Sequence, residues 1–498
     1  MPPRKKKKTK GKARKAGAVV VPDGAGGAAA PSLVEILPAA LLVDVATFLP
    51  AMDLARLQCV CRLFIGPAPG TGVGDGAAAA ARGGGVVAAA SAAAALATHG
   101  RPLPPLLPGE APTLALRFVE ATAAARQRAV PIACRNHTLV ATASGRLLTF
   151  GEGEQSALGH GYSPTLRDLK VPKVVKALAG VRVVAVAAGE WHSLAVTDEG
   201  RLLSWGRDGW GVLGNGGNGG TFQSTPVPVA ALAHERVASV AAGGHWSMAL
   251  TADGRVFTWG GNFGGTLGHG VRGECRLPKL VEALVGQPIA QIAAGDHHAL
   301  ALSAEGKVSS WGSAVWGCPG HGVKTDQLLP KEVEALAATR VVHVSASSAV
   351  SMSVAADGRL FTWGSADAGA LGHADLSDRL TPTVVEALAG TQVLLAFAGY
   401  MQAMAVAADG RLFTWGRGKW GTLGHGDEEN QRMPKVVEAL ASQRVVRAAS
   451  FTASLAVTAS GRVFAWGQGK NGRLGLGGDL NDRTTPTVVA ALTGMRIG

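Results

Sequence analysis

The chain has 498 residues, a length that suggests about three domains of roughly 150 residues unless internal repeats change the count. Apolar residues make up 47% of it, enough for a sizeable core, while 69 glycines and 25 prolines are too many for a helical bundle. Charged residues or prolines interrupt the longest apolar stretches, so we expect no membrane span and a soluble protein. The five cysteines form no Cys-x-x-Cys pair, which argues against a disulfide scaffold or a zinc site and favours a reducing compartment.

The N-terminal segment, residues 1–31, is strongly basic. Nine Lys and Arg residues lie between Arg4 and Lys15 without an acid, so the rest of the chain carries only +4 of the net charge of +13. Because like charges repel and nothing apolar is available to bury, we expect a disordered tail. Such a run is typical of nuclear targeting or of binding to phosphate backbones, with a solubilising arm or a transit peptide as alternatives. The predicted targeting residues, which favour a nuclear or cytoplasmic location, are Arg4, Lys5, Lys6, Lys7 and Lys8.

Residues 32–64 have the pattern of two short amphipathic helices. Leucines, valines and Phe48 recur at helical spacing in the first half, and Pro50 ends that helix. In the second half, Asp53 is placed to cap a helix whose apolar residues end at Phe64. Two helices this small cannot bury all their apolar side chains against each other. The segment therefore either binds a partner or packs as a cap on the main domain.

The same segment resembles an F-box in its Leu-Pro start, its Leu-Leu pair, its Phe-Leu and Asp-Leu steps, and its Val-Cys step before an aromatic residue. It departs from that pattern at Phe64, where a Trp is usual, and at Gly66-Pro67, which cuts the third helix short. The resemblance implies docking onto a Skp-type adaptor of a cullin ubiquitin ligase. The adaptor contacts that it implies are Leu37, Pro38, Leu41, Leu42, Val45, Leu54, Leu57 and Val60.

Residues 65–128 are dominated by Gly, Ala and Pro and are typical of a linker, with one short helix expected near residues 114–128. After this linker, one pattern recurs seven times. An aromatic residue followed by Gly occurs at intervals of 51 to 55 residues, and each copy also repeats an apolar run, a Gly, an alternating segment and a Gly turn. The anchor aromatics are Phe150, Trp205, Trp259, Trp311, Trp363, Trp415 and Trp466.

Short segments separated by glycine turns predict about four antiparallel strands in each copy. In the second copy, for example, strands are expected at residues 183–188, 194–197 and 201–205, with an extended stretch at 225–232. Radial repetition of four-stranded sheets is the propeller solution, so residues 129–498 predict a mainly β fold with seven blades. Residues 494–498 align with the region where the first copy begins, which favours a closed ring.

These copies resemble the regulator of chromosome condensation repeat. The second copy has Gly-Glu-Trp-His-Ser-Leu-Ala-Val-Thr at residues 189–197, and other copies have Asp-Gly-Arg before the Trp-Gly anchor and Leu-Gly-His-Gly after it. The family's founding member is an exchange factor for a Ran-type GTPase that contacts chromatin. A plant photoreceptor of the family uses Trp two residues before the His position of Gly-x-x-His. None of the seven copies has Trp there, so we do not expect photoreception.

Histidines recur in the Leu-Gly-His-Gly loops and in the Gly-x-x-His position, but repetition argues against a catalytic role because a catalytic group is needed once. We expect the loop histidines, among them His160 and His269, to make hydrogen bonds between strands. The Gly-x-x-His position also accepts Val350 and Ala453, and no nucleophile or phosphate-loop motif stands out. The sequence therefore predicts no enzyme activity and no cofactor.

Binding is better indicated by the loop after each Trp-Gly anchor, where side chains vary on a shared scaffold. Tryptophan stands five residues beyond the anchor in the second, fourth and sixth copies, and basic residues lie nearby. Each of these tryptophans either anchors a partner or packs across a blade junction. The predicted partner-binding residues are Trp210, Trp316, Trp420, Arg207, Arg417 and Lys419.

The combined pattern predicts the substrate-recognition subunit of a cullin-type (SCF) ubiquitin ligase, in which the propeller binds an unknown target protein. A chromatin-associated exchange factor for a Ran-like small GTPase and a non-enzymatic propeller scaffold are the alternatives. No membrane partner is expected.

Overall fold

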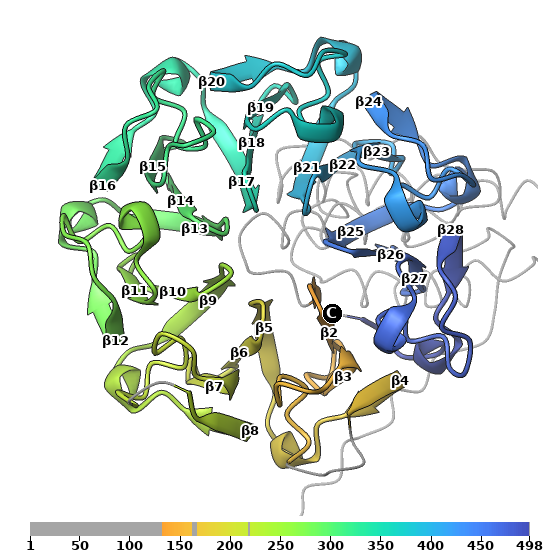
Figure 1. The fold of residues 1–498 in the computed structure, drawn as a ribbon, viewed down its shortest axis with the longest axis horizontal. Coiled ribbons are helices and arrows are strands. Elements are labelled where there is room, and N and C mark those ends of the chain that lie inside the picture. Colours follow the sequence, from red (N-terminus) through yellow and green to blue (C-terminus); the bar gives the residue numbers. More distant parts are fainter. Residues whose placement is uncertain (1–131, 162–166, 218–219, 498) are drawn as a thin grey trace, which may run out of the picture.

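The computed structural model describes residues 132–161, 167–217 and 220–497. The predicted basic tail, the F-box-like segment and the linker lie outside these residues. The described chain forms seven four-stranded antiparallel sheets, arranged as blades around a central axis (Figure 1). In every blade the four strands follow one another in chain order from the centre of the ring outward. The predicted seven-bladed, mainly β propeller is therefore confirmed.

The strands fall into four concentric sets. The innermost strands are β1 (Ile132–Cys134), β5 (Val183–Ala188), β9 (Val237–Ala242), β13 (Ile289–Ala294), β17 (Val341–Ser347), β21 (Val393–Ala398) and β25 (Val445–Ser450). The second strands are β2 (His137–Ala141), β6 (His192–Thr197), β10 (Trp246–Thr251), β14 (His298–Ser303), β18 (Val350–Ala355), β22 (Gln402–Ala407) and β26 (Ala453–Thr458). The third strands are β3 (Leu147–Glu152), β7 (Leu202–Arg207), β11 (Val256–Gly260), β15 (Val308–Gly312), β19 (Leu360–Gly364), β23 (Leu412–Gly416) and β27 (Val463–Gly467).

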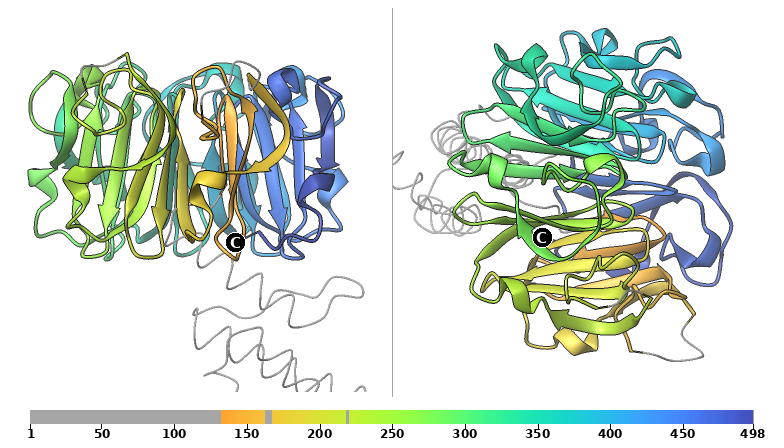
Figure 2. Two further views of the ribbon diagram at one scale, coloured as in Figure 1. Left: turned by 90° about the horizontal axis from the view of Figure 1, so that it is seen from below. Right: turned by 60° about the vertical axis from the view of Figure 1, so that its left-hand side comes forward.

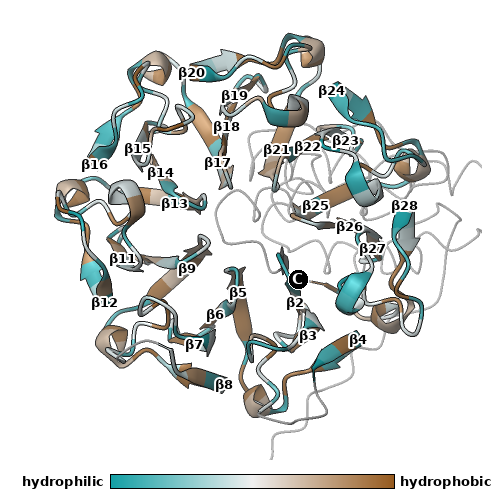
Figure 3. Cartoon of the chain, viewed as in Figure 1, coloured by the Kyte–Doolittle hydropathy of each residue, from teal (hydrophilic) through white to brown (hydrophobic). Residues whose placement is uncertain are grey.

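The outermost strands are β4 (Asp168–Val174), β8 (Phe222–Pro228), β12 (Cys275–Leu280), β16 (Gln327–Glu332), β20 (Arg379–Val384), β24 (Gln431–Val436) and β28 (Arg483–Val488). Each contains proline near its centre, which suits an edge strand because proline has no amide N–H to donate. In all seven blades the pairing register shifts beside this proline. Figure 3 shows the change from apolar inner strands, such as β21 and β25, to hydrophilic outer strands, such as β16 and β24.

A short 3-10 helix follows each outermost strand. Residues 225–232, predicted to be extended throughout, therefore divide into the end of β8 and a helix, η2 (Ala230–Leu232). The other helices of this kind are η1 (Lys176–Leu178), η4 (Glu282–Leu284), η5 (Glu334–Leu336), η7 (Glu386–Leu388), η9 (Glu438–Leu440) and η11 (Ala490–Leu492). Four more, in the loops between third and fourth strands, are η3 (Phe263–Gly265), η6 (Asp367–Gly369), η8 (Lys419–Gly421) and η10 (Lys470–Gly472).

The second strands are buried on both sides, whereas the predicted alternation at residues 194–197 implied one exposed face. All six residues of β6 are buried, as are all six of β14, β18, β22 and β26. The reason is that each sheet lies between two neighbouring sheets, so both of its faces become core. The alternation in sequence is one of larger and smaller side chains rather than of buried and exposed ones.

The six anchor tryptophans tie each blade to the one before it. Each is 0% exposed, and its indole N–H donates to a backbone carbonyl of the preceding blade at 2.7–2.9 Å. The predicted role of the loop histidines is also confirmed, because His160, His269, His321, His373 and His425 each contact a Thr or Ser hydroxyl of the third strand at 2.8–3.0 Å. The tryptophans thus serve the joints between blades, and the histidines hold each loop to the third strand of its own blade.

Blade 7 meets blade 1 through contacts of a different kind, since Phe150 has no N–H to donate. Arg473 forms an ion pair with Glu152 at 2.9 Å, and both side chains are largely buried. On the other face of the ring, Ile497 forms an isolated bridge with Thr142, next to a 2.7 Å backbone hydrogen bond. The expected closure between the last and first copies is confirmed, and all four strands of every blade come from one continuous segment.

Candidate protein-binding surface

The ring has two faces, seen edge-on in Figure 2. We call one the loop face, because it carries the loops between first and second strands and between third and fourth strands. The other is the turn face, which carries the tight turns between second and third strands and the connections from blade to blade. Antiparallel pairing in chain order places these two sets of connections at opposite ends of each sheet.

All six predicted partner-binding residues lie on the loop face, in blades 2, 4 and 6. Trp210 is 48% exposed and Trp316 is 42% exposed, whereas Trp420 is half-buried with the Lys419 ammonium 4.7 Å from its ring centroid. Arg207 and Arg417 are half-buried, and each lies over an aromatic ring of its own blade. The six residues therefore share one face without forming one cluster.

A first aromatic cluster extends over blades 2 to 4. Phe263 lies at its centre, with edge-to-face contacts to Trp210 at 5.2 Å and to His297 at 5.9 Å between ring centroids. His245 lies 6.1 Å from Phe263 and 5.6 Å from Trp191, and a Glu190 carboxylate oxygen lies 3.4 Å from its imidazole. Because Phe263 is 40% exposed and Trp210 is 48% exposed, this cluster presents apolar rings to the surroundings.

A second cluster lies on blades 6 and 7 and reaches blade 1. The rings of Tyr400 and Phe451 are 5.2 Å apart, and the guanidinium of Arg135 lies 4.5 Å from the Phe451 centroid. Arg135 also forms an ion pair with Asp296 of blade 4, across the mouth of the central channel. Burial would raise the pKa of Asp296, but the adjacent Arg135 charge holds it below its ordinary value. This ion pair connects the two clusters.

Trp210 and Trp420 are held in backbone conformations that bulky residues rarely adopt. Both have φ of 63°, in the left-handed region, and the matching position in blade 3 is Gly264 with φ of 68°. A non-glycine residue there costs roughly 1–2 kcal/mol. Trp210 contacts Phe263 across the junction of blades 2 and 3 and is still 48% exposed, so its ring both packs at this junction and remains accessible to a partner.

Replacing Trp210 with glycine is expected to change the free energy of unfolding by less than about 1 kcal/mol, because relief of backbone strain offsets the lost contact with Phe263. Denaturant titration of the Trp210→Gly variant checks this expectation. A loss of more than about 3 kcal/mol would instead identify Trp210 as packing across the junction of blades 2 and 3, the alternative that the sequence left open.

Sequence reasoning missed the aromatic partners on the loop face, namely Trp191, His245, Phe263, His297, Tyr400 and Phe451. Most of them stand one or two residues before the Gly-x-x-His position, a slot that varies from copy to copy. That variation was the available signal. The variation did not reveal that side chains at these positions in neighbouring blades contact one another or a common ring.

Three buried His and Ser pairs resemble part of a hydrolase site, but their hydrogen bonds join neighbouring blades and have a structural role. His137, His192 and His298 lie 2.7–2.9 Å from Ser193, Ser247 and Ser351 of the next blade. Each serine hydroxyl donates to a backbone carbonyl, so its oxygen accepts from the imidazole N–H. The histidine is thus a donor rather than a base toward the serine. Burial lowers the pKa of His137 and His192 to about 3 and that of His298 to about 4.

The central channel is lined mainly by alanine and serine of the innermost strands. The Gln291 side chain, which lines the channel, already has two hydrogen-bond partners. Its Nε2 donates to the carbonyl of Val344, and its Oε1 accepts from the amide N–H of Val344. Within the described residues, no group of three or more His, Cys, Asp or Glu side chains is arranged to hold a metal ion. The same residues include no helix that is long and apolar enough to cross a membrane.

Fold and surface together define a seven-bladed propeller scaffold that presents aromatic and basic side chains on one face. The chain belongs to the RCC1-like family, since the family model described as RCC1-like domain matches residues 167–497.

Among known proteins, the ultraviolet-B receptor UVR8 of Arabidopsis thaliana is 34% identical over 376 residues, which cover 75% of this chain and 84% of that protein. The E3 ubiquitin-protein ligase HERC2 of Mus musculus is 37% identical over 364 residues, which cover 72% of this chain but only 7% of that protein. Among solved structures, Prp20p of Saccharomyces cerevisiae has a TM-score of 0.62 at 22% identity, covering 70% of this chain and 87% of that one. The last likeness concerns the fold.

Proposed function

We propose that the chain is the substrate-recognition subunit of a cullin-type ubiquitin ligase, acting as a non-enzymatic bridge in the nucleus or cytoplasm. In this proposal the F-box-like segment, residues 32–64, binds a Skp-type adaptor, and the propeller holds the protein to be ubiquitinated. The observation that carries the propeller's part is the exposed aromatic loop face. The F-box-like pattern supports the adaptor's part from sequence.

The loop face suits protein recognition for physical reasons. Tryptophan and arginine are the side chains most often found as binding anchors, because they combine a large contact area with a polar group. Trp210 and Phe263 offer exposed rings, and Arg207, Arg417 and Lys419 are already held over rings on the same face. A partner that covers these rings removes apolar surface from water. The relationship to HERC2, a ubiquitin-protein ligase by name, agrees with such a use of the propeller.

Coexpression of the full chain with a Skp-type adaptor is expected to give copurification, and Leu41→Asp is expected to reduce the recovered adaptor at least tenfold. The reason is that a carboxylate at an apolar contact must be desolvated in the complex. The measurement is the adaptor-to-chain ratio after affinity purification. As a matched control, Leu329→Asp changes a leucine that is 50% exposed on the outer strand β16, and it should leave the ratio unchanged.

If soluble wild-type chain recovers no adaptor, the ligase proposal is wrong. The second candidate is then nucleotide exchange on a Ran-like GTPase, favoured by the family to which the chain belongs. Prp20p, which shares the fold, is described as binding Gsp1p and histones. That candidate requires the chain to accelerate release of a fluorescent nucleotide from the GTPase. If the release rate also stays unchanged, the propeller is a scaffold for other partners.

A further inference from the structure

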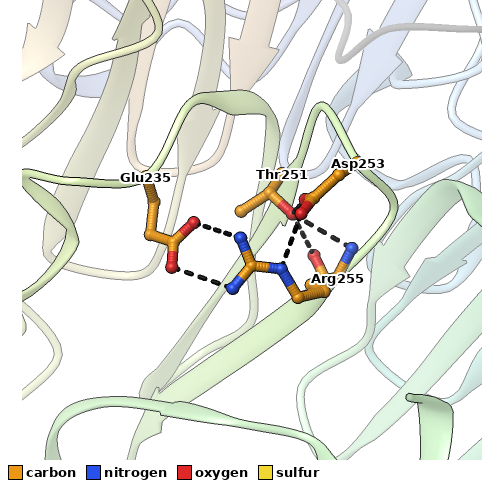
Figure 4. Close-up of polar contacts among 4 residues, drawn as sticks. All are labelled: Glu235, Thr251, Asp253 and Arg255. Carbon is orange, nitrogen blue, oxygen red and sulfur yellow. Dashed lines mark hydrogen bonds and ion pairs between the residues drawn. The ribbon is translucent and has the colours of Figure 1, made fainter. Parts of the chain in front are cut away.

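The tight turns on the turn face repeat a charge pattern. In blades 2 to 6, an acid stands immediately before the turn glycine and a cation immediately after it. Figure 4 shows blade 3, where Arg255 contacts Asp253 of its own turn at 2.8 Å and Glu235 of the preceding connection. Arg201, Arg359 and Arg411 are paired with the acids of their own turns at 2.7–3.1 Å, and Lys307 lies 3.8 Å from Glu332. These five blades are locally neutralised.

Blades 1 and 7 break the pattern. Their turns read Ser144-Gly145-Arg146 and Ser460-Gly461-Arg462, with serine in place of the acid. Each serine hydroxyl lies 2.8–2.9 Å from the threonine hydroxyl two residues earlier. Both arginines are exposed, and neither forms an ion pair with any carboxylate in the described part of the chain. The cations of these two turns therefore remain uncompensated.

Ring closure makes these two turns neighbours, and the connections around them add more positive charge. Arg182 packs directly over the turn of blade 1, since a Cβ on Gly145 would lie 2.2 Å from Arg182 Cγ. Arg496 lies between the two turns, and its carbonyl accepts the amide N–H of Ala143 at 2.7 Å. The helix η1 begins with Lys176, whereas η4, η5, η7 and η9 begin with glutamate.

We call these four exposed cations the arginine arc: Arg146, Lys176, Arg182 and Arg462. The segments that carry them, residues 142–146, 176–182 and 459–462, contain no Asp or Glu, and neither do the neighbouring residues 490–497. On both sides the arc ends at acids, with Glu199 on blade 2 and Asp409 on blade 6. The turn face thus carries one confined region of positive charge over blades 7 and 1.

We propose that the arginine arc binds a short acidic segment of a partner protein. Charge complementarity supports this occupant, because Arg146, Arg182 and Arg462 are exposed and form no ion pair with a carboxylate of the described residues. Each of these guanidinium groups can therefore take a carboxylate in two parallel hydrogen bonds. The confinement of the arc favours a short segment, since the bordering acids repel an anion that extends beyond it. The inference holds whether or not the chain binds a Skp-type adaptor, because it concerns the face opposite to the aromatic loop face.

Nucleic acid fits this surface less well. A double helix is uniformly charged along its length, so on this face it would cross the acid-bearing turns of the other blades. Single strands are usually held by stacking on exposed aromatic rings. The ring nearest to the arc, Phe464, is buried beneath Arg462, which lies 5.0 Å from its centroid.

To test this proposal, the serine before the turn glycine in blades 1 and 7 is replaced by aspartate, because blades 2 to 6 have an acid at that position. Binding of a rhodamine-labelled peptide of eight glutamates to the full chain is measured by fluorescence anisotropy at low ionic strength. Wild type is expected to bind this peptide more tightly than an eight-glutamine peptide, and Ser144→Asp with Ser460→Asp is expected to weaken binding about tenfold. Both proteins keep the basic tail, so their difference reports the arc. Arg146→Gln with Arg462→Gln should give a similar loss.

A mirror variant supplies the control. Asp357→Ser with Asp409→Ser creates serine turns in blades 5 and 6 and frees Arg359 and Arg411, so the glutamate peptide should bind more tightly than to wild type. Equal affinities for wild type and the Ser144→Asp, Ser460→Asp variant would overturn the proposal. It would also be overturned if a 20-base-pair duplex lost more affinity than the peptide in that variant, since the arc would then be a nucleic acid site.

Discussion

Acidification from pH 7 to pH 5 is expected to lower the free energy of unfolding of the propeller by about 2 kcal/mol for each of its three bonded, fully buried histidines. His137 and His192 have their pKa lowered to about 3, and His298 to about 4, in each case chiefly by burial. The unfolded chain therefore binds protons below pH 6.5 that the folded chain cannot accept. The contribution of these histidines to stability is fully present above pH 6.5 and is lost as the pH falls toward 3.

Urea titrations at pH 7 and pH 5 measure this effect, and blade 6 suggests a matched variant. There, Gln402 takes the histidine position and donates to Ser450 at 2.7 Å. His298→Gln should therefore keep a hydrogen bond to the next blade while removing one titrating group. We expect it to show about 2 kcal/mol less destabilisation between the two pH values than wild type. The same loss in both proteins would mean that His298 does not contribute.

Replacing an anchor tryptophan is expected to have the largest effect of any single substitution in the ring. Trp363→Ala should lower the free energy of unfolding by about 3–5 kcal/mol, because it empties a fully buried position and removes the 2.7 Å bond to the Cys318 carbonyl. Trp363→Phe should cost less, about 1–3 kcal/mol, since Cys318 keeps its bond from Ser351 and blade 1 already accommodates Phe150.

Thermal and urea unfolding of these two variants check the order of the effects. Trp316→Ala is the control, because this tryptophan is 42% exposed on the loop face of blade 4, and its loss should cost less than about 1 kcal/mol. A comparable loss at Trp316 and Trp363 would contradict the assignment of one to the surface and the other to the joints between blades.

The sequence predicted the parts of this fold that each copy specifies by itself. The Trp-Gly anchors gave the number of blades, and the recurrence of the loop histidines indicated their structural role, which the contact of His269 with Thr258 confirms. The sequence also placed the exposed Trp210 and Trp316 in the loop after the Trp-Gly anchor, which is the loop between the third and fourth strands of a blade. Repetition made these predictions strong, because the aromatic anchor recurs in seven copies and the loop histidine in five.

The surfaces were harder to predict because they join residues that are distant in the chain. Arg135 and Asp296, which connect the two aromatic clusters, are separated by 161 residues. Ser144 and Ser460 appear unremarkable as single turn residues, and only ring closure brings their two turns together. Such relations depend on which blades are neighbours and which face a loop occupies. The roles proposed for the F-box-like segment and the basic tail stay predictions, because they fall outside the described residues.

The prolines of the outermost strands restrict how other molecules can approach the ring. An unbroken edge strand invites a foreign strand to extend the sheet, but here all seven perimeters are interrupted, at Pro172 in blade 1 and at equivalent positions elsewhere. Lateral growth into fibres or side-to-side oligomers is thereby discouraged. A partner that binds by adding a strand is therefore disfavoured at the perimeter, whereas the loop face and the turn face lie on opposite sides of the disc.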